Sequence, residues 1–124
     1  MTLQDSGKLR ALIVDDEPAC RDSLRLMLSL EGFHVVTAAS AAEAVQQAAL
    51  DPPDVVIIDC ILRERSRGLD VLASLRQTIP HLHAVIVSGY PSSSMEAEIR
   101  RTPRTVYLPK PFPPAELIAA VRAG

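Results

Sequence analysis

The stretch "ALIVDDEPA" (residues 11–19) decides the fold, because a run of apolar residues leads directly into three carboxylates. The apolar run is continuous rather than alternating, which is typical of a parallel strand buried on both faces. Pro18 suits the first turn of a helix. Asp15, Asp16 and Glu17 repel one another, so something in the folded protein must offset the cost of placing them together.

The rest of the chain alternates in the same way between short apolar runs and helical patterns. Besides 9–15, strands are predicted at "FHVVTAA", "DVVIID", "HAVIVSG" and "TVYLP" (33–39, 54–59, 83–89 and 105–109). Helices are predicted from Pro18 to a stop at Gly32, from the capping box "SAAE" (40–43) to Leu50, near 68–78, over a short and weakly held 91–101, and over 113–124. This alternation predicts an α/β fold with a doubly wound parallel sheet of five strands and five helices.

Length and charge narrow the class of protein. The 124 residues suit one domain, and the formal net charge of −2 gives no pull toward nucleic acid or an anionic membrane. No apolar run approaches the roughly 20 residues of a membrane span, and no signal peptide precedes the fold, so we expect a cytoplasmic protein without membrane contact. Cys20 and Cys60 form no CxxC pair and are predicted to be buried, reduced thiols.

Polar side chains stand at the ends of four of the predicted strands. Asp15 and Asp16 end the first strand, Asp59 ends the third, Ser88 ends the fourth, and Lys110 follows the fifth. The carboxyl ends of parallel strands meet at one edge of a sheet, which is where ligands bind in this class of fold. The sequence therefore predicts that these five groups converge.

The chemistry of this set is that of phosphoryl transfer. Clustered carboxylates suit Mg²⁺, which prefers oxygen ligands and bridges to phosphate. The Lys110 ammonium and the Ser88 hydroxyl would contact phosphoryl oxygens, and one aspartate would be the nucleophile. An acidic pair before a helix can also simply cap that helix, but its convergence with Asp59, Ser88 and Lys110 favours the phosphoryl site.

These motifs resemble a known family. "IVDDEP", "VVIIDC", "VIVSG" and "YLPKPF" occur in the order and near the spacings of the receiver domains of two-component response regulators, which are similar to the chemotaxis receiver. The resemblance runs over residues 9–124, leaving 1–8 as an N-terminal tail. It implies the flavodoxin-like receiver fold, with strand order 2-1-3-4-5.

The resemblance also assigns roles at the site. Asp59 would be the phosphoacceptor. Mg²⁺ would be bound by the side chains of Asp16 and Asp59, by the backbone carbonyl of Ile61, and by Asp15 through a water. The phosphate would come from a histidine of a sensor histidine kinase or a histidine phosphotransfer protein. Such a domain is not an enzyme acting on an external substrate, but it phosphorylates and dephosphorylates itself.

A switch is implied as well. Ser88 and Lys110 would contact the phosphoryl oxygens, Tyr107 would turn inward as Ser88 moves, and the Lys110–Pro111 bond would be cis. Tyr107 can also be a plain aromatic strand residue at a sheet edge. The expected output is a changed surface on the fourth helix, fifth strand and fifth helix, which would also serve a homodimer. Since the sequence ends one helix after the last strand, we expect no direct nucleic acid binding by this chain.

The loop after Asp59 departs from the family pattern. It reads "ILRERSRG", with Arg63 in the usual proline position and one residue more than usual before Gly68. The bulk of Ile61 and Tyr90 beside the phosphate would hinder the attacking water, so we expect the phosphate to be lost slowly, over longer than seconds. The arginines are interpreted as a solvated loop rather than a docking patch, and the histidines as structural residues (Arg63, Arg65, Arg67; His34, His81, His83).

Two other functions use related residues. Aspartyl phosphatases of the haloacid dehalogenase type place their nucleophile in a DxD motif after the first strand, whereas "DDE" stands here and the lone Asp59 follows the third. A pseudo-receiver would bind partners without phosphorylation, but the complete set of Asp15, Asp16, Asp59, Ser88 and Lys110 argues against that. A nucleotide site is disfavoured because none of the five glycines forms a phosphate-binding loop.

Overall fold

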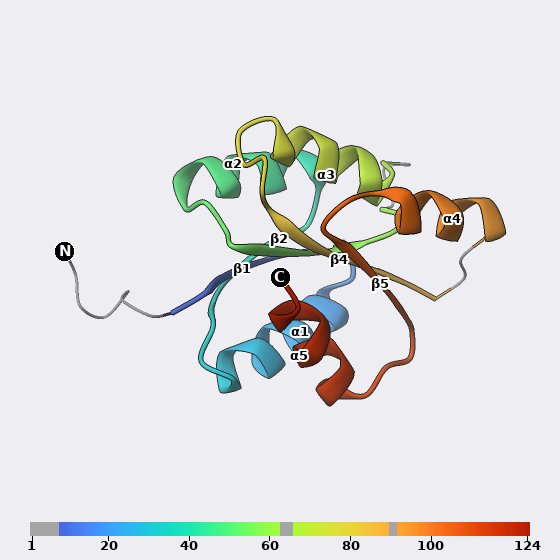
Figure 1. Ribbon diagram of the computed structural model, residues 1–124. Coiled ribbons are helices and arrows are strands. Elements are labelled where there is room, and N and C mark those ends of the chain that lie inside the picture. The colour runs from blue at the N-terminus through green and yellow to red at the C-terminus, as the bar shows by residue number, and fades with distance from the viewer. Residues whose placement is uncertain (1–7, 63–65, 90–91) are drawn as a thin grey trace.

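The computed structural model describes residues 8–62, 66–89 and 92–124, in which five strands form one parallel sheet (Figure 1). The strands are β1 (Arg10–Val14), β2 (His34–Ala38), β3 (Val55–Asp59), β4 (His83–Ser88) and β5 (Thr105–Pro109). Their order is β2-β1-β3-β4-β5, and every neighbouring pair is parallel. This confirms the predicted sheet and its order.

Helices cover both faces of the sheet. They are α1 (Pro18–Leu30), α2 (Ala41–Leu50), α3 (Gly68–Arg76), α4 (Ser93–Arg101) and α5 (Pro114–Arg122). Figure 1 shows α1 and α5 on one face and α2, α3 and α4 on the other. The predicted third helix is two residues shorter than expected, since it ends at Arg76 rather than at 78. No helix within the described ranges is long and apolar enough to cross a membrane.

The helix ends follow from local chemistry. Pro18 opens α1, and Gly32 follows the helix with a φ of +91°, a left-handed conformation that glycine adopts at little cost. Ser40 Oγ accepts a hydrogen bond from the Glu43 N–H at 3.2 Å. Glu43 Oε1 accepts one from the Ala39 N–H at 3.0 Å, one residue before the cap residue itself. The capping box is therefore confirmed in a slightly shifted form.

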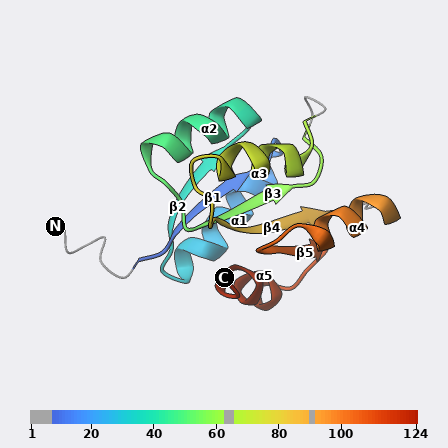
Figure 2. The same ribbon diagram turned by 45° about the horizontal axis from the view of Figure 1, so that its top comes forward.

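Alternation along the strands divides the core into two layers. Leu12, Val56 and Ile86 pack with α2, α3 and α4, whereas Ile13, Ile57 and Val85 pack with α1 and α5. The central strands are buried on both faces, as their continuous apolar runs predict. Figure 2 shows the strands side by side with α2 and α3 over one face.

The alternation continues into the polar residues at the carboxyl edge. Asp15 follows Ala11 and Ile13 in period two, and Asp59 follows Val55 and Ile57, so both belong to the face of α1 and α5. The register pairs Val14 with Ile58, which makes Asp15 and Asp59 neighbours across β1 and β3. The sheet itself therefore brings the two carboxylates together.

Gly68 lets α3 begin very close to the end of β3. Its N–H donates to the Cys60 carbonyl at 2.8 Å. A Cβ atom added at Gly68 would lie 2.5 Å from the backbone oxygen of Asp59 and 3.2 Å from Ile58 Cγ2. Only glycine fits without a shift of the backbone that carries Asp59.

We predict that Gly68→Ala destabilises the protein by about 1–3 kcal/mol, because the added methyl overpacks a rigid backbone contact. Gly89→Ala is the matched control, since a Cβ there meets nothing within 4 Å. Urea unfolding of the two variants measures the difference. A Gly68→Ala variant as stable as the wild type would contradict the close approach.

Candidate functional site

Asp15 carries a buried carboxylate at the end of β1, with a residue exposure of only 1%. Its Oδ1 accepts a hydrogen bond from the Glu17 N–H at 2.9 Å, next to the start of α1. Its Oδ2 is buried and accepts no hydrogen bond from the described residues. Glu17 is the N-cap residue of α1 and makes no side-chain cap hydrogen bond, so Asp15 accepts from the cap residue itself rather than from an N–H inside the helix. The helix-capping interpretation is therefore not confirmed, and Oδ2 remains available to a cation.

Lys110 reaches two carboxylates. Its Nζ lies 3.4 Å from Asp59 Oδ2 and 3.9 Å from Asp15 Oδ2. Its backbone N–H donates to the Ser88 carbonyl at 2.9 Å, which ties the residue to the end of β4. The Lys110–Pro111 peptide bond is cis, as predicted. Sequence positions as distant as 15 and 110 thus meet at one edge of the sheet.

The pKa values follow from burial and from these contacts. Burial raises the pKa of Asp15, and the Glu17 N–H and Lys110 oppose that rise without cancelling it. Burial also works against the charge of Lys110, but the carboxylates of Asp59 and Asp15 outweigh it and raise the pKa of the lysine. The environment therefore favours the protonated, positively charged form of Lys110 and disfavours the ionised form of Asp15.

The remaining acidic residues flank this pair. Asp59 is half-buried, and its Oδ1 accepts a hydrogen bond from the Ile61 N–H at 3.2 Å. Ile61 itself is 55% exposed beside the site. Asp16 is half-buried, and its charge contributes to the raised pKa of Asp15. The acidic residues predicted from the sequence therefore do converge.

The donor set fits a hard divalent cation. Across the described parts of the chain, no three His, Cys, Asp or Glu side chains are grouped so as to hold a metal ion. Mg²⁺ does not need such a cage, because it keeps several waters and binds through one or two carboxylates and a phosphate. The buried Asp15 Oδ2, which no hydrogen bond satisfies, is the kind of oxygen that a nearby cation would stabilise.

Tyr107 packs in the core layer that α4 covers, and Ser88, at the carboxyl end of β4, follows Ala84 and Ile86 of that layer in period two. Ser88 ends β4 and is 4% exposed. The Tyr107 hydroxyl is buried and has no hydrogen-bond partner within the described ranges. Its pKa is raised by burial first, and then by the carboxylate of Glu96. The two predicted switch residues therefore share the face that α4 covers.

Several contacts at the site were not predicted. Arg21 Nη1 donates to the Asp15 carbonyl at 2.8 Å, from a position one turn into α1. The Arg67 guanidinium pairs with Glu98 of α4. The Arg21 contact could be suspected from its helical position, one turn after Pro18 beside the strand end. The pair between residues 67 and 98 has no signal in the spacing of the sequence.

Comparison with known proteins identifies the family. A model of the response regulator receiver domain matches residues 11–122. The chain belongs to the response regulator receiver domain family. It is therefore a receiver domain of two-component signal transduction, as the resemblance of its motifs predicted.

Similar proteins include two mycobacterial regulators. The receiver domain is 37% identical over 115 residues to response regulator MprA of Mycobacterium leprae, covering 93% of this chain and 50% of that protein. It is 39% identical over 115 residues to transcriptional regulatory protein KdpE of Mycobacterium tuberculosis, covering 91% and 49%. The chain thus spans about half the length of these relatives.

Solved structures agree with the fold. A CheY-like receiver from Methanospirillum hungatei superposes with a TM-score of 0.85 at 27% identity, covering 94% of this chain and 92% of that one. The receiver domain of NtrX from Brucella abortus gives a TM-score of 0.80 at 31% identity, covering 92% and 99%. The receiver fold predicted from the sequence is confirmed.

Some predictions need correction or lie outside the structure described. Cys20 is only half-buried, because it lines an open groove that Lys110, Pro111 and Phe112 also line, although both cysteines are free thiols as expected. Arg67 is exposed to solvent, as predicted for the arginines, and in addition forms an ion pair with Glu98. The predictions for Arg63, Arg65 and Tyr90 fall outside the described residues.

The histidines lie away from the acidic edge. His34 Nε2 is 2.8 Å from Asp51 Oδ2, and the His83 ring bonds the Ala120 carbonyl at 2.7 Å. His81 is exposed between α3 and β4. These contacts agree with the structural role predicted for them.

We predict that Asp15→Asn raises the stability of the receiver domain at pH 7 in EDTA, by about 1 kcal/mol, a typical single-site effect. A carboxyl whose folded pKa is raised opposes folding above that pKa, and the cost vanishes as the pH falls through the raised value toward 3.8. The gain should therefore shrink in acid. Mg²⁺ should stabilise the wild type more than the variant.

Thermal unfolding with and without Mg²⁺ measures these differences. Asp22→Asn, an exposed acid on α1, is the control and should leave the Tm nearly unchanged. An Asp15→Asn variant that melts below the wild type at pH 7 in EDTA would show that the buried charge is stabilising, contrary to this account.

Proposed function

We propose that this chain is the phosphoacceptor of a two-component phosphorelay, in which Asp59 receives a phosphoryl group from a histidine of a sensor kinase or histidine phosphotransfer protein. One observation carries the proposal: Lys110 Nζ lies 3.4 Å from Asp59 Oδ2 and 3.9 Å from Asp15 Oδ2, at the carboxyl edge of a parallel sheet. A carboxylate nucleophile beside a fixed cation is what phosphoryl transfer requires.

In the transfer step, a carboxylate oxygen of Asp59 attacks phosphorus. An O–P bond forms, the N–P bond to the donor histidine breaks, and the electron pair remains on the histidine nitrogen. The Lys110 ammonium is placed to stabilise the oxygens that gain negative charge. Ile61 donates its N–H to Asp59 Oδ1 at 3.2 Å, so the carboxylate is oriented before the donor arrives.

Magnesium would be held by Asp16, Asp59 and the Ile61 carbonyl, with Asp15 acting through a bound water. When bound, Mg²⁺ offsets the carboxylate repulsion and polarises the phosphoryl oxygens. The buried Asp15 Oδ2 without a hydrogen bond supports this assignment. The side chain of Ile61 is exposed, and we expect its bulk to hinder the water that would attack the phosphoryl group. Slow loss of phosphate therefore stays a prediction.

The output would be read on α4, β5 and α5. Ser88 would contact the phosphoryl group, and Tyr107 would turn inward as Ser88 moves. The Tyr107 hydroxyl has no hydrogen-bond partner among the described residues, so no such bond would be lost in this movement. A homodimer through this surface is part of the proposal. The domain would act by binding partners rather than on an external substrate, and direct nucleic acid binding is not expected of this chain.

An apolar groove beside the site suits the donor protein. It has a volume of about 370 Å³ and lies between α1 and the segment after β5; its lining is Ala19, Cys20, Ser23, Leu24, Met27, Lys110, Pro111 and Phe112. Transfer requires the donor histidine to reach Asp59, and the groove shares Lys110 with the site. We propose that an apolar helix of the donor protein packs here.

We predict that acetyl phosphate adds one phosphoryl group to the wild type in Mg²⁺ and none in EDTA. Asp59→Asn should abolish the gain, because the nucleophile is lost. The exposed Asp54, which precedes β3 at the opposite end of the same strand, provides the control, and Asp54→Asn should be phosphorylated like the wild type. Intact-protein mass spectrometry measures all four cases.

No gain with acetyl phosphate or another small donor would favour a pseudo-receiver that binds partners without phosphorylation. A gain that persists in Asp59→Asn would place the acceptor elsewhere. Either result would overturn the proposed role of Asp59.

A further inference from the structure

Few buried side chains hold α4 on the sheet. Ile99 is its one fully buried residue. Its carboxyl end is fixed by Thr102, whose hydroxyl donates to the Glu98 carbonyl at 2.8 Å. The position of the helix therefore depends more than usual on a small number of side-chain contacts.

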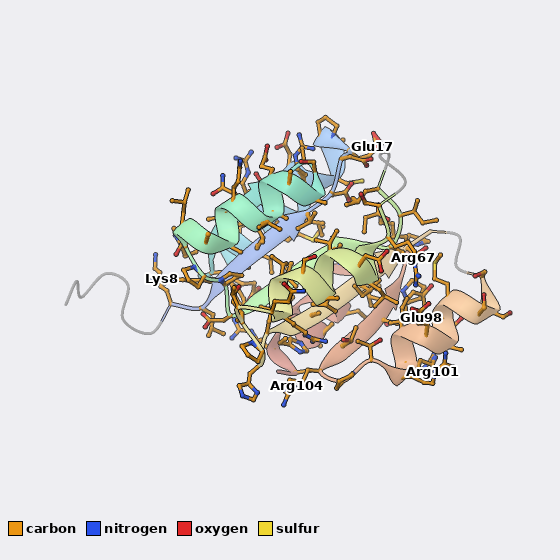
Figure 3. All side chains as sticks on the ribbon, turned by 90° about the horizontal axis from the view of Figure 1, so that it is seen from above. Lys8, Glu17, Arg67, Glu98, Arg101 and Arg104 are labelled. Carbon is orange, nitrogen blue, oxygen red and sulfur yellow. The ribbon has the colours of Figure 1, made fainter. Side chains whose placement is uncertain are left out.

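Two such contacts join α4 to the segments around the phosphoacceptor. Met95 Sδ lies 2.8 Å from the sulfur of Cys60, the residue after Asp59. One turn further along the helix, Glu98 Oε1 lies 2.5 Å from Arg67 Nη2. Figure 3 shows Arg67 and Glu98 next to each other, at the start of α3 and on α4. Residues three apart share one helix face, so both contacts are made by the same face of α4.

Arg67 is also fixed through its backbone. Its carbonyl accepts from the N–H groups of Asp70 and Val71 at the start of α3, at 3.0 and 3.2 Å. It pairs with Ile61 in an isolated antiparallel bridge. Ile61 in turn donates its N–H to Asp59 Oδ1. A short series of contacts thus leads from α4 through Arg67 and Ile61 to the phosphoacceptor.

The ion pair is charged and accessible to solvent. Both side chains are 45% exposed. The hydrogen bond from Arg67 lowers the pKa of Glu98, and the same bond raises the pKa of Arg67. Pairs of this kind shift an equilibrium by about two- to fivefold and weaken in salt. A shift of this size can change the fraction of molecules in which α4 packs against Arg67, but it does not fix the helix in one position.

We propose that the Arg67–Glu98 ion pair is a latch that holds α4 against the loop after Asp59, with Arg67 acting as a positioning residue for that loop. Any effect of the latch on phosphorylation rests on the proposed function of Asp59 as the phosphoacceptor. The closed latch is proposed to inhibit phosphorylation, so opening it favours phosphorylation of Asp59. Because coupling between two sites is reciprocal, phosphorylation of Asp59 would in turn loosen α4.

The α4 helix supplies a matched control. Glu96 pairs with Arg100 on the same helix at 2.8 Å, an ion pair of the same chemistry within α4 rather than between α4 and Arg67. Glu96→Gln removes an equivalent charge from α4 and leaves the latch intact. Glu98→Gln and Arg67→Gln open the latch from either side. The double variant with Arg67→Glu and Glu98→Arg reverses its polarity.

The first test is residue-resolved hydrogen exchange of the whole chain in EDTA, without a phosphodonor. The reporters are two backbone amides near Arg67, together with the amides of α4. The Leu62 N–H donates to the carbonyl of Ser66, and the Gly68 N–H donates to the carbonyl of Cys60. Glu98→Gln and Arg67→Gln should each speed exchange in both regions by about two- to fivefold. The double variant should return both toward wild type.

Two results would overturn the latch. One is an unchanged exchange rate at Leu62 and Gly68 in Glu98→Gln, which would mean that α4 does not bear on the loop. The other is an equal increase in the exchange rates of these amides in Glu96→Gln, which would mean that the total charge of α4, rather than the Arg67–Glu98 pair, causes the effect. In 1 M salt, the wild type should approach the single variants, because the screening length falls to about 3 Å.

The second test is the rate of phosphorylation by acetyl phosphate in Mg²⁺, followed by intact mass. Opening the latch should raise the rate about two- to fivefold, whereas Glu96→Gln should match the wild type. A lower or unchanged rate in both latch variants would overturn the inhibitory direction. If the wild type takes up no phosphate, the proposed function fails, and hydrogen exchange still decides whether the latch exists.

Discussion

The structure depends on holding several carboxylates at one edge of a buried sheet with a single lysine among them. Asp15 is almost fully buried, and its Oδ2 accepts no hydrogen bond from the described residues. Lys110 lies within 4 Å of both Asp15 and Asp59, so its charge offsets part of their repulsion. The imbalance that remains is a cost to stability, and it gives the site its attraction for a cation, which together with Lys110 would offset the negative charge of a phosphoryl group.

The alternation of strand side chains connects this site to the opposite face of the sheet. Asp15 and Asp59 belong to the face of α1 and α5, where the apolar groove lies. The next residue after Asp59 is Cys60, which points to the other layer and contacts Met95 of α4. Because Cys60 directly follows Asp59, a displacement of the phosphoacceptor would be passed through this one residue to Met95 of α4, the helix proposed to carry the output.

Much of this arrangement could be predicted from the sequence. Continuous apolar runs ending in Asp15, Asp59 and Ser88 define buried parallel strands, and parallel strands bring their ends to one edge. The cis bond before Pro111 came from family resemblance and is present. The strands were predicted one residue too long at several ends, where backbone hydrogen bonds such as that from the Asp15 N–H to the Ala38 carbonyl continue one residue past the assigned strand.

Other features depend on contacts between segments that no spacing encodes. The pairing of Arg67 with Glu98 needs α3 and α4 to be placed side by side first. Gly68 was predicted at the start of a helix, but the sequence does not show that its lack of a side chain lets α3 approach the backbone of Asp59. Asp15 accepts the Glu17 N–H with one oxygen and faces Lys110 with the other, a division of its two oxygens that the sequence does not show.

The most direct test of the central claim is to locate the phosphoryl bond. Phosphorylation with acetyl phosphate in Mg²⁺, followed by borohydride reduction, converts an aspartyl phosphate to homoserine, which peptide mass spectrometry places in the sequence. Homoserine is expected at position 59, formed only when Mg²⁺ is present. Homoserine at position 15 or 16, or an equal yield in EDTA, would contradict the assignment of Asp59 as the nucleophile in a metal-assisted site.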